Sequence, residues 1–414
     1  MLAHIRTAAR ARRAAPTAVL GSVLARVAAF TPPSTCVPPF VGGTVPLSII
    51  VALVGTTSTG KSINDRVAAD LLPNMPPGVA GPFALGSGEG AAEAYLERYT
   101  AKDDNGRNIQ KQRQVNYGVL FTLDEGRVLT ELGSRSGSTI VPTLCTMWTG
   151  GDPGRMNASA DTRRTLPVGG YTFGLVSLWQ PTRMAGLFDD TDGGLPGRFL
   201  FLGVNDPDAP DIAPDWPGPL EWAPPSWIAA EGVTQPSPLR YPDDARAEVD
   251  ARRLAKLRDE PVPALDGHRD LGRLKIAGVL ALIDGQRSEV ADIHWKLAGD
   301  MLDSSDRTRG AVLAELDIER RRAEESGNAK AGRREVAKVT AIETKALDAA
   351  VRAIGRKAHR EGAKVLPRRE LTQAIKGTDR KVVGVDAPLE EAERLGYIVA
   401  TDGGWTAGES RPAA

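Results

Sequence analysis

Four mainly apolar runs along the chain predict buried strands. The first, LSIIVALVG (47–55), is rich in β-branched residues, as expected of a strand buried on both faces of a parallel sheet. The others are VNYGVLFTLDEG (115–126), YTFGLVSLWQ (171–180) and GRFLFLG (197–203). Because helical or loop segments separate these runs, the pattern predicts an α/β fold with a mainly parallel sheet.

The segments around these strands mostly show helical spacing. We expect helices over 1–30, ending at Thr31-Pro32-Pro33, over 62–72, ending at Pro73, and from about 127. Between the first two strands we expect a Pro/Gly-rich loop up to Gly90, a short helix over 91–99, and a polar loop or edge from 102 to 114. From residue 243 onward the pattern is helical, including a highly charged, solvated helix over 317–346.

This pattern suggests five successive parts. They are an N-terminal helical segment (1–45), a P-loop domain (46–206), a Pro-rich linker wrapped on the surface (207–242), a helical domain (243–346) and a small C-terminal module (347–410). In the last part, Pro367 is expected to begin one helix and Pro388 another. The strand-like YIVA and the turn Asp402-Gly403-Gly404 follow. Helices followed by a hairpin are typical of a winged helix.

Composition and charge narrow the classes of protein. Apolar residues make up 41% and charged residues 25% of the 414 positions, and the formal net charge is zero, so no global field attracts a polyanion. Locally, however, residues 330–381 carry 15 Lys or Arg against 6 Asp or Glu. The two cysteines have no disulfide or zinc spacing, and no apolar run reaches the roughly 18 residues of a membrane span. We therefore expect a cytoplasmic protein without a membrane partner.

The first thirty residues allow two interpretations. They are Arg-rich and contain no acidic residue, as in organelle transit peptides, but they also form an ordinary amphipathic helical pattern. We favour the structural interpretation, because an apolar core region followed by an A-x-A-like cleavage site is missing.

The main chemical signal directly follows the first strand and matches G-x-x-x-x-G-K-[ST] in full. The glycines would let main-chain N–H groups surround phosphate oxygens, Lys61 would place a charge on the β and γ phosphates of ATP, and Ser62 would offer a hydroxyl to Mg²⁺. The context of a buried strand before it and a helix after it favours this site over a simple Gly/Thr-rich turn. The predicted nucleotide-binding residues are Gly55, Thr56, Thr57, Ser58, Thr59, Gly60, Lys61 and Ser62.

Two acids end the second strand. Asp124 is expected to hold Mg²⁺ together with Ser62, and Glu125 to orient or deprotonate the attacking water. The competing interpretation is an exposed pair of acids at the start of the next helix, where their negative charges interact favourably with the helix dipole.

Three further residues are weaker candidates for catalysis. Glu89, between glycines, is either a second water-polarising acid or an acid in a surface loop. Gln180 ends the third strand and is either a sensor of the γ-phosphate or a turn residue before Pro181. Arg198, after a Gly/Pro loop, is either an arginine finger or the partner of a nearby acid such as Asp189. Arg163 and Arg164 are weaker candidates for contacts with nucleic acid.

Taken in order, ARARRAAPTAVLGSVLARV, LSIIVALVGTTSTGKS, GSGEG, LFTLDEG, YTFGLVSLWQP and GLPGRFLF resemble a helicase-like P-loop family of phages, prophages and integrative elements. The resemblance covers about residues 1–316. It implies a RecA-like ATPase core, with Lys61 and Ser62 as Walker A residues, Asp124 and Glu125 as Walker B acids, and a primase-polymerase as partner. This chain shows no primase-polymerase segment ahead of its P-loop, so priming activity is not expected.

We therefore expect an ATP-hydrolysing, Mg²⁺-dependent, RecA-like protein that acts on DNA, with single-stranded DNA as the favoured form. Its expected task is that of a helicase-like motor in replication of a phage or mobile element. An arginine finger supplied in trans would require a homo-oligomer, such as a hexamer. The alternative is an ATP-dependent regulator or loader whose winged-helix tail binds a protein or operator DNA without unwinding it.

Overall fold

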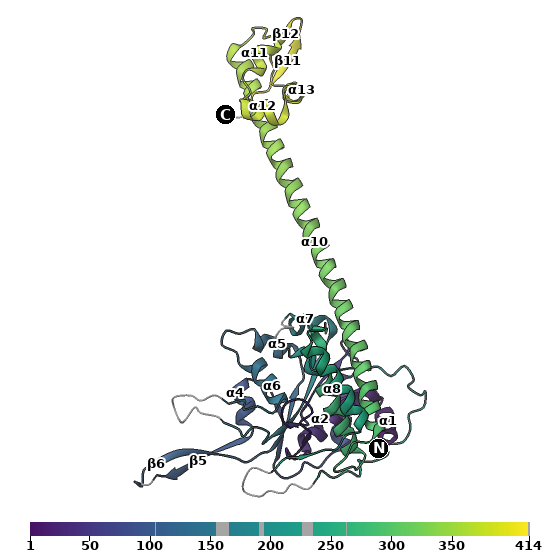
Figure 1. Ribbon diagram of the computed structural model, residues 1–414. Helices are drawn as coiled ribbons and strands as arrows, with labels where there is room; N and C mark the ends of the chain where they lie inside the picture. The colour runs from purple at the N-terminus through teal and green to yellow at the C-terminus, as the bar shows by residue number, and fades with distance from the viewer. Residues whose placement is uncertain (104, 155–164, 190–193, 226–234, 262, 413–414) are drawn as a thin grey trace. The chain divides into compact units, whose positions relative to one another are not determined.

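A five-stranded parallel sheet forms the centre of the N-terminal part of the chain (Figure 1). In this computed structural model the strand order is β4-β7-β8-β3-β9, and every neighbouring pair runs parallel. The predicted α/β class with a parallel sheet is therefore confirmed. The strands are β3 (Ile49–Val54), β4 (Val79–Ala84), β7 (Gly118–Leu123), β8 (Thr172–Trp179) and β9 (Phe199–Gly203).

The structure describes residues 1–103, 105–154, 165–189, 194–225, 235–261 and 263–412. Arg163 and Arg164 lie outside this set. The chain forms two compact units, Met1–Glu319 and Arg320–Ala414. The expected boundaries at 45, 206 and 242 separate no such units, because helices from both the N-terminal segment and the region after 243 share one apolar core with the sheet.

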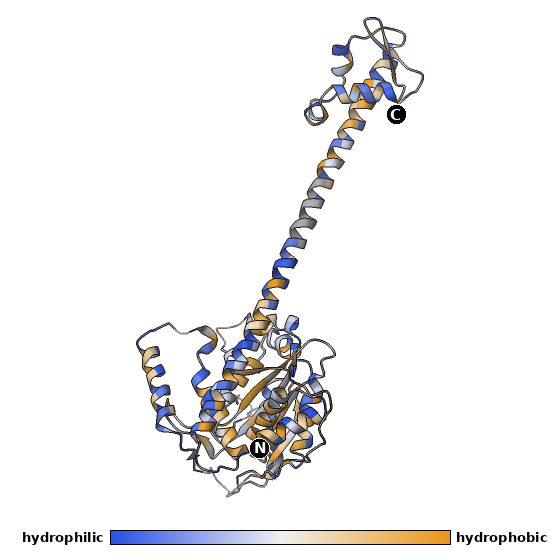
Figure 2. Cartoon of the chain, turned by 90° about the vertical axis from the view of Figure 1, so that its right-hand side faces the viewer, coloured by the Kyte–Doolittle hydropathy of each residue, from blue (hydrophilic) through white to orange (hydrophobic). Residues whose placement is uncertain are grey.

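The alternation of side chains along the central strand divides the core into two layers. Ile49, Val51 and Leu53 of β3 face one cluster, whereas the residues between them face the other. Figure 2 shows the apolar strands at the centre of these layers. The first layer contains α1 (Leu2–Ala11), α2 (Pro16–Phe30), α3 (Lys61–Leu71) and α9 (Arg269–Ile283). The second contains α4 (Gly88–Glu93), α5 (Arg127–Gly133), α6 (Ile140–Trp148) and α7 (Ala185–Phe188).

Helix α2 lies unusually close to the sheet. A Cβ atom added at Gly174 of β8 would lie 1.9 Å from the Ala25 carbonyl oxygen, and one at Gly118 of β7 would lie 1.9 Å from the Ala29 carbonyl oxygen. Twelve residues of α2 are buried, so the expectation of one amphipathic helix over 1–30 is wrong for this part. The segment is two helices, and the second is a core helix because it contacts both the sheet and its neighbouring helices.

The region between the first two predicted strands differs from expectation. The supposed Pro/Gly loop contains β4, an edge strand with a register shift between Ala80 and Phe83. The supposed helix over 91–99 is the short α4 followed by a strand, β5 (Leu96–Lys102). This strand pairs with β6 (Asn108–Gln114) in an antiparallel hairpin. Proline, glycine and a mostly polar composition conceal these strands, because none of them has the continuous apolar run of a buried strand.

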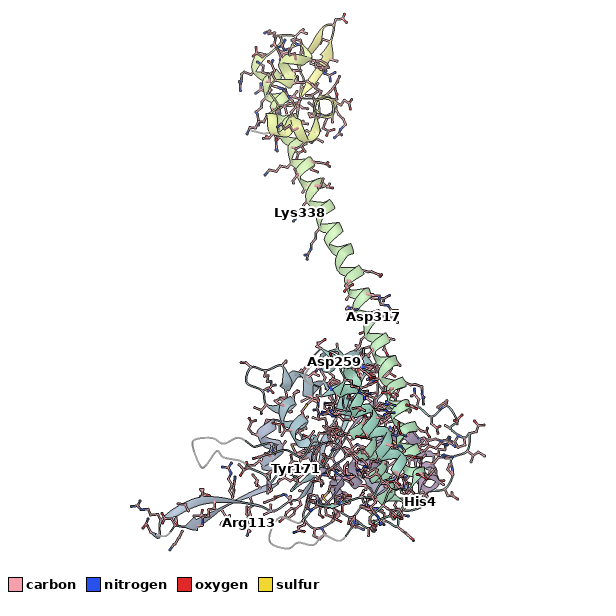
Figure 3. All side chains as sticks on the ribbon, in the orientation of Figure 1. His4, Arg113, Tyr171, Asp259, Asp317 and Lys338 are labelled. Carbon is pink, nitrogen blue, oxygen red and sulfur yellow. The ribbon has the colours of Figure 1, made fainter. Side chains whose placement is uncertain are left out.

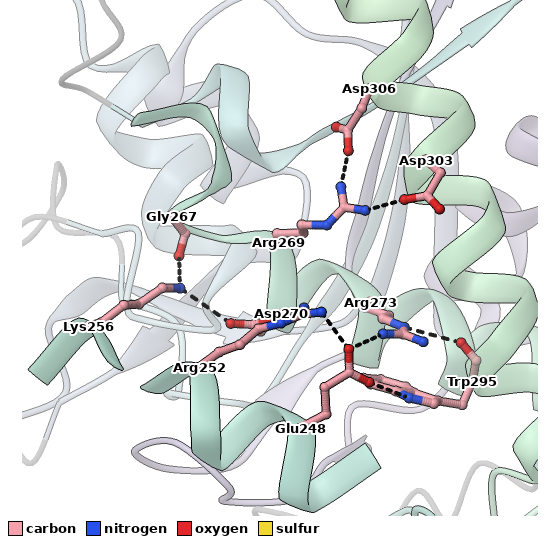
Figure 4. Close-up of polar contacts among 10 residues, drawn as sticks. All are labelled: Glu248, Arg252, Lys256, Gly267, Arg269, Asp270, Arg273, Trp295, Asp303 and Asp306. Carbon is pink, nitrogen blue, oxygen red and sulfur yellow. Dashed lines mark hydrogen bonds and ion pairs between the residues drawn. The ribbon is translucent and has the colours of Figure 1, made fainter. Parts of the chain in front are cut away.

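Hydrogen bonds and ion pairs connect the helices that follow the sheet in the chain to one another (Figure 4). Glu248 of α8 (Asp243–Leu257) accepts hydrogen bonds from Arg273 of α9 at 2.8 Å and from Trp295 at 3.1 Å. Trp295 belongs to α10 (Asp292–Glu361), which also covers the edge strand β9. There the Ser305 hydroxyl accepts the hydrogen bond of the Phe201 N–H at 2.8 Å. An edge N–H that would otherwise be buried without a partner is thereby satisfied.

Short elements complete this unit. A small sheet joins β10 (Ser237–Pro238), β1 (Thr35–Val37) and β2 (Val45–Pro46) in that order. The end of the predicted linker thus pairs with a strand that precedes the main sheet. Single helical turns of the 3-10 type are η2 (Pro181–Arg183), η3 (Pro196–Arg198) and η4 (Ala264–Asp266).

The second unit has its own small core. The end of α10 packs with α11 (Arg368–Thr372), α13 (Asp386–Arg394) and the antiparallel pair β11 (Ile398–Thr401) and β12 (Gly404–Ala407). Leu366 forms an additional antiparallel bridge with Trp405, and α12 (Gly377–Val383) contributes no buried residue. The expected helices near 367 and 388 and the hairpin are present. The charged stretch 317–346 is helical as predicted, and its described side chains are mainly exposed. No helix among the described residues is both long and apolar enough to cross a membrane.

The contact between α2 and β8 leads to a stability prediction. Gly174→Ala places a methyl group against a main-chain oxygen and should lower the free energy of unfolding by about 3 kcal/mol. The matched change Gly272→Ala in α9 meets no atom within 4 Å and should raise it by about 0.5–1 kcal/mol, since alanine favours a helix. Urea titrations measure both. An unchanged unfolding midpoint for Gly174→Ala would contradict the close packing.

Candidate functional site

The segment between β3 and α3 is a tight turn from a strand into a helix, as expected. β3 ends at Val54 and α3 begins at Lys61. Ser58 and Gly60 adopt positive φ angles of 68° and 74°, which curl the main chain within the turn. The amino end of α3, where main-chain N–H groups lack helical partners, therefore opens at the carboxyl edge of the central strand.

Gly55 joins this turn to the strands on both sides. Its N–H donates to the Trp179 carbonyl oxygen of β8 at 3.0 Å. A Cβ atom at position 55 would lie 2.3 Å from a methyl group of Val204, which follows β9. Glycine is required here by close packing, and the packing fixes where the turn begins.

The Lys61 ammonium group folds back over the turn. It donates to the carbonyl oxygens of Gly55 at 3.0 Å and Thr56 at 2.7 Å. Partial burial lowers the pKa of Lys61 from its ordinary value. The cation thus lies beside the main-chain amides of the turn, an arrangement that would attract an anion.

Asn64, which lies outside the motif, stabilises the turn through hydrogen bonds of its side chain. This side chain is 1% exposed. Its Oδ1 accepts from the Ala15 N–H at 2.9 Å, and its Nδ2 donates to the Gly60 carbonyl oxygen at 3.0 Å. A polar residue at a core-facing position of α3 is the sequence signal that could have identified it.

The turn after β7 that carries Asp124 and Glu125, here called the acid turn, is bonded to β8. The same strand holds residues 55–62, which we call the P-loop segment after the motif that they match. The Gly126 N–H donates to the Leu178 carbonyl oxygen at 2.7 Å. A Cβ atom at position 126 would lie 2.1 Å from the Trp179 indole ring. Consecutive carbonyl groups of β8, those of Leu178 and Trp179, therefore hold the acid turn and the start of the P-loop segment side by side.

One cavity of about 780 Å³ joins the two predicted parts of the site. Ser58, Gly60, Lys61 and Ser62 line it from one side, and Asp124 lines it from the other. Hydroxyl and carboxylate oxygens are the donors that Mg²⁺ prefers, and Mg²⁺ on a nucleotide takes only one or two carboxylates. Ser62 and Asp124 offer one oxygen donor of each of these kinds to the cavity. No group of three or more His, Cys, Asp or Glu suited to a metal occurs among the described residues.

Glu125 and Gln180 flank this cavity without being part of its lining. The Glu125 carboxylate is exposed and accepts from the Arg127 Nε at 3.2 Å. Gln180 directly follows β8, and its Oε1 lies 3.4 Å from the Thr57 hydroxyl, which donates to it. The amide therefore contacts the P-loop segment directly, as its place at the strand end suggests.

Glu89 has a different neighbour. It is exposed near the start of α4 and accepts a hydrogen bond from the Thr139 hydroxyl at 2.8 Å. It does not line the cavity that contains Lys61. Its proposed role in polarising water stays a prediction.

Arg198 lies at the other end of the strands. Phe199 is paired with Ile50 at the start of β3, whereas the P-loop segment follows the end of that strand. The Arg198 guanidinium donates to the Gly194 carbonyl oxygen at 2.5 Å and lies 5.6 Å from the Trp148 ring. Burial lowers its pKa. Within one chain, Arg198 and Lys61 are thus not brought together, and a finger role would require a second copy of the chain.

Comparison with protein-family models and with curated proteins finds no match to this chain. The assignment of the site therefore depends on its geometry and on the motif itself.

The contacts of Asn64 lead to a second prediction. Asn64→Ala leaves the Ala15 N–H without its acceptor, which should lower the free energy of unfolding by about 1–3 kcal/mol. Asn64→Asp keeps an acceptor for Ala15 but places a buried carboxylate against the Gly60 carbonyl oxygen, so it should lower the free energy of unfolding at least as much. Urea unfolding measures both variants. Unaltered stability of Asn64→Asp would contradict the donor role of the Asn64 amide.

Proposed function

We propose that this protein is a Mg²⁺-dependent, RecA-like P-loop ATPase that acts on DNA, with a helicase-like task in replication of a phage or mobile element. The observation that carries the proposal is the shared cavity of Lys61 and Asp124 at the carboxyl edge of a parallel sheet. Ligands of open α/β sheets bind at this edge. The intervening strand β8 contributes Gln180 between the two groups.

The residues of the cavity suggest their own roles. Main-chain amides of 55–62 would receive the β and γ phosphates of ATP, and Lys61 would exchange its contacts with carbonyl oxygens for contacts with phosphate. Ser62 and Asp124 would hold Mg²⁺, which neutralises charge on the phosphates when it is bound. The turn is fixed by Gly55 and Asn64, so little reorganisation is needed when the nucleotide enters.

Hydrolysis requires a group that orients water toward the γ-phosphate. Glu125 is next to Asp124, and its pairing with Arg127 is exposed to solvent, where an ion pair contributes little free energy. The carboxylate can therefore turn toward a bound water at small cost. Gln180, which accepts a hydrogen bond from the Thr57 hydroxyl, would report the state of the phosphates to β8.

A DNA partner is supported by the second unit and by the family resemblance. The second unit combines helices, a hairpin and the additional bridge at Leu366, in the order of a winged helix. Its exposed basic residues could contact phosphates. They include Arg368, Arg369, Lys376, Arg380 and Lys381. A homo-oligomer, such as a hexamer, would be needed for Arg198 to act as a finger, and a primase-polymerase is the partner that the resemblance implies.

The self-contained core of the second unit favours one alternative function. A module that folds around its own buried residues can bind a protein or operator DNA independently of any motor. The chain would then be an ATP-dependent regulator or loader. ATPase activity stimulated by single-stranded DNA, together with strand separation, supports the motor, whereas sequence-specific duplex binding without unwinding supports the regulator.

Lys61→Ala tests the proposed site directly. The variant loses the cation that would contact the phosphates, so ATP turnover should fall at least about 100-fold. Lys296→Ala, which removes an exposed lysine of α10, serves as the matched control and should hydrolyse ATP like the unaltered protein. Phosphate release with excess Mg²⁺ measures both. Turnover by Lys61→Ala at the control rate would refute the ATPase assignment.

Glu125→Gln tests the role of the second acid. The amide keeps the size of the side chain but cannot take a proton, so ATP should still bind while hydrolysis falls about 10²–10⁴-fold. Equilibrium binding and single-turnover hydrolysis measure these quantities separately. Loss of binding with normal turnover of each bound ATP would assign Glu125 to nucleotide binding instead.

A further inference from the structure

The β5–β6 hairpin extends outward from the N-terminal unit (Figure 1). Figure 3 shows the side chains of this hairpin, among them Arg113, on both sides of the ribbon and outside the densely packed body of the unit. Seven residue pairs join the two strands, from Leu96 with Gln114 to Lys102 with Asn108. None of the fourteen residues is fully buried, so the strands have no apolar core of their own.

The base of the hairpin, by contrast, is firmly attached. Tyr95 is fully buried, and its hydroxyl donates to the Thr172 carbonyl oxygen of β8 at 2.8 Å. Gln114 donates to the Gly170 carbonyl oxygen at 2.9 Å, and Asn116 donates to that of Ala94 at 2.9 Å. An isolated two-stranded ribbon is only marginally stable in water. A rigidly anchored ribbon with both faces exposed therefore suits a surface that contacts a partner.

The two faces differ in chemistry. One face, which we call the amide face, contains no carboxylate among its strand residues, and Gln110 donates to Thr100 across it at 3.0 Å. Lys102 forms no ion pair with another described residue. The amide face consists of Leu96, Arg98, Thr100, Lys102, Asn108, Gln110, Gln112 and Gln114.

The opposite face has similar charges but no row of amides. Arg113 forms an ion pair with Glu97 at 2.7 Å, and its guanidinium lies 5.5 Å from the centre of the Tyr99 ring. On the amide face, Arg98 is likewise paired with Glu93 at 2.8 Å. Each face carries one further lysine, Lys111 and Lys102, so the faces differ in their amides and not in their charge.

We propose that the amide face of the β5–β6 hairpin enters the major groove of duplex DNA. The major groove admits a two-stranded ribbon, and Gln, Asn and Arg are the side chains that form paired hydrogen bonds with base edges. Lys102 would contact a phosphate, and Gln110 and Gln112 would face the bases. This inference rests on the proposed action on DNA, and it adds the surface and the form of DNA that it contacts.

A single strand fits the hairpin less well. Proteins hold single strands chiefly by stacking bases on exposed aromatic rings. The hairpin has one aromatic residue, Tyr99, which is on the opposite face with Arg113 near its ring. An acidic protein could form ion pairs with the cations, but its carboxylates would not match the row of amides as base edges do.

Matched charge reversals in the full-length chain test the proposal. Lys102→Glu and Lys111→Glu change the net charge equally, on opposite faces of the same hairpin. Lys102→Glu should weaken binding to a 30-base-pair duplex at least about tenfold, and should flatten the dependence of log K on log salt by about 0.9. Lys111→Glu should weaken it less than about threefold. DNA-free ATP turnover should be unchanged in both variants. Fluorescence anisotropy with duplex and single-stranded probes supplies the affinities.

Several results would overturn the inference. Equal loss of affinity in both variants would show a general charge effect without a preferred face. Tighter binding of the single strand, insensitive to Lys102→Glu, would remove the duplex assignment. If the unaltered protein hydrolyses ATP in a Lys61-dependent manner but does not bind duplex DNA, the inference fails while the ATPase proposal stands. If Lys61→Ala keeps full turnover, the ATPase proposal fails whatever the hairpin binds.

Discussion

The carboxyl end of β8 is the part of the structure on which the candidate site depends. Its last two residues, Leu178 and Trp179, present consecutive carbonyl groups that accept the N–H groups of Gly126 and Gly55. Because main-chain hydrogen bonds have narrow geometry, the acid turn and the P-loop segment are held in one relative position. The Trp179 ring fills the space above Gly126, so neither turn can move without disturbing the core.

The two edges of the sheet serve different purposes. At the carboxyl edge, a cation and a carboxylate line an open cavity. At the opposite edge, Lys275 is fully buried and donates to three carbonyl oxygens, including that of Trp148 at 2.5 Å. Burial and nearby cations lower the pKa of His268 there to about 4. Arg198 belongs to this closed edge, where its guanidinium lies 5.6 Å from the centre of the Trp148 ring.

Close packing and exposure are combined within one unit. α2 contacts the sheet at main-chain distance through glycines in β7 and β8, which makes the platform under the site rigid. The β5–β6 hairpin is inserted between two strands of the same sheet and carries only exposed or partly buried residues. Since its base is bonded to β8 through Tyr95 and Thr172, contacts on the hairpin and events at Gln180 involve the two ends of one strand. Under the proposed function, this connection would allow DNA bound at the hairpin to influence ATP hydrolysis.

The sequence by itself determined the four buried strands, the turn that ends at Lys61 and the place of Asp124, because long apolar runs and a glycine-rich motif depend on local chemistry. It did not reveal β4 or the hairpin, whose polar and proline-containing strands are recognisable only through their partners. Only the tertiary structure decided that α2 is a core helix, that Asn64 supports the P-loop segment, and that Arg198 lies at the far edge. Each of these depends on contacts between residues distant in the chain, which no local pattern encodes.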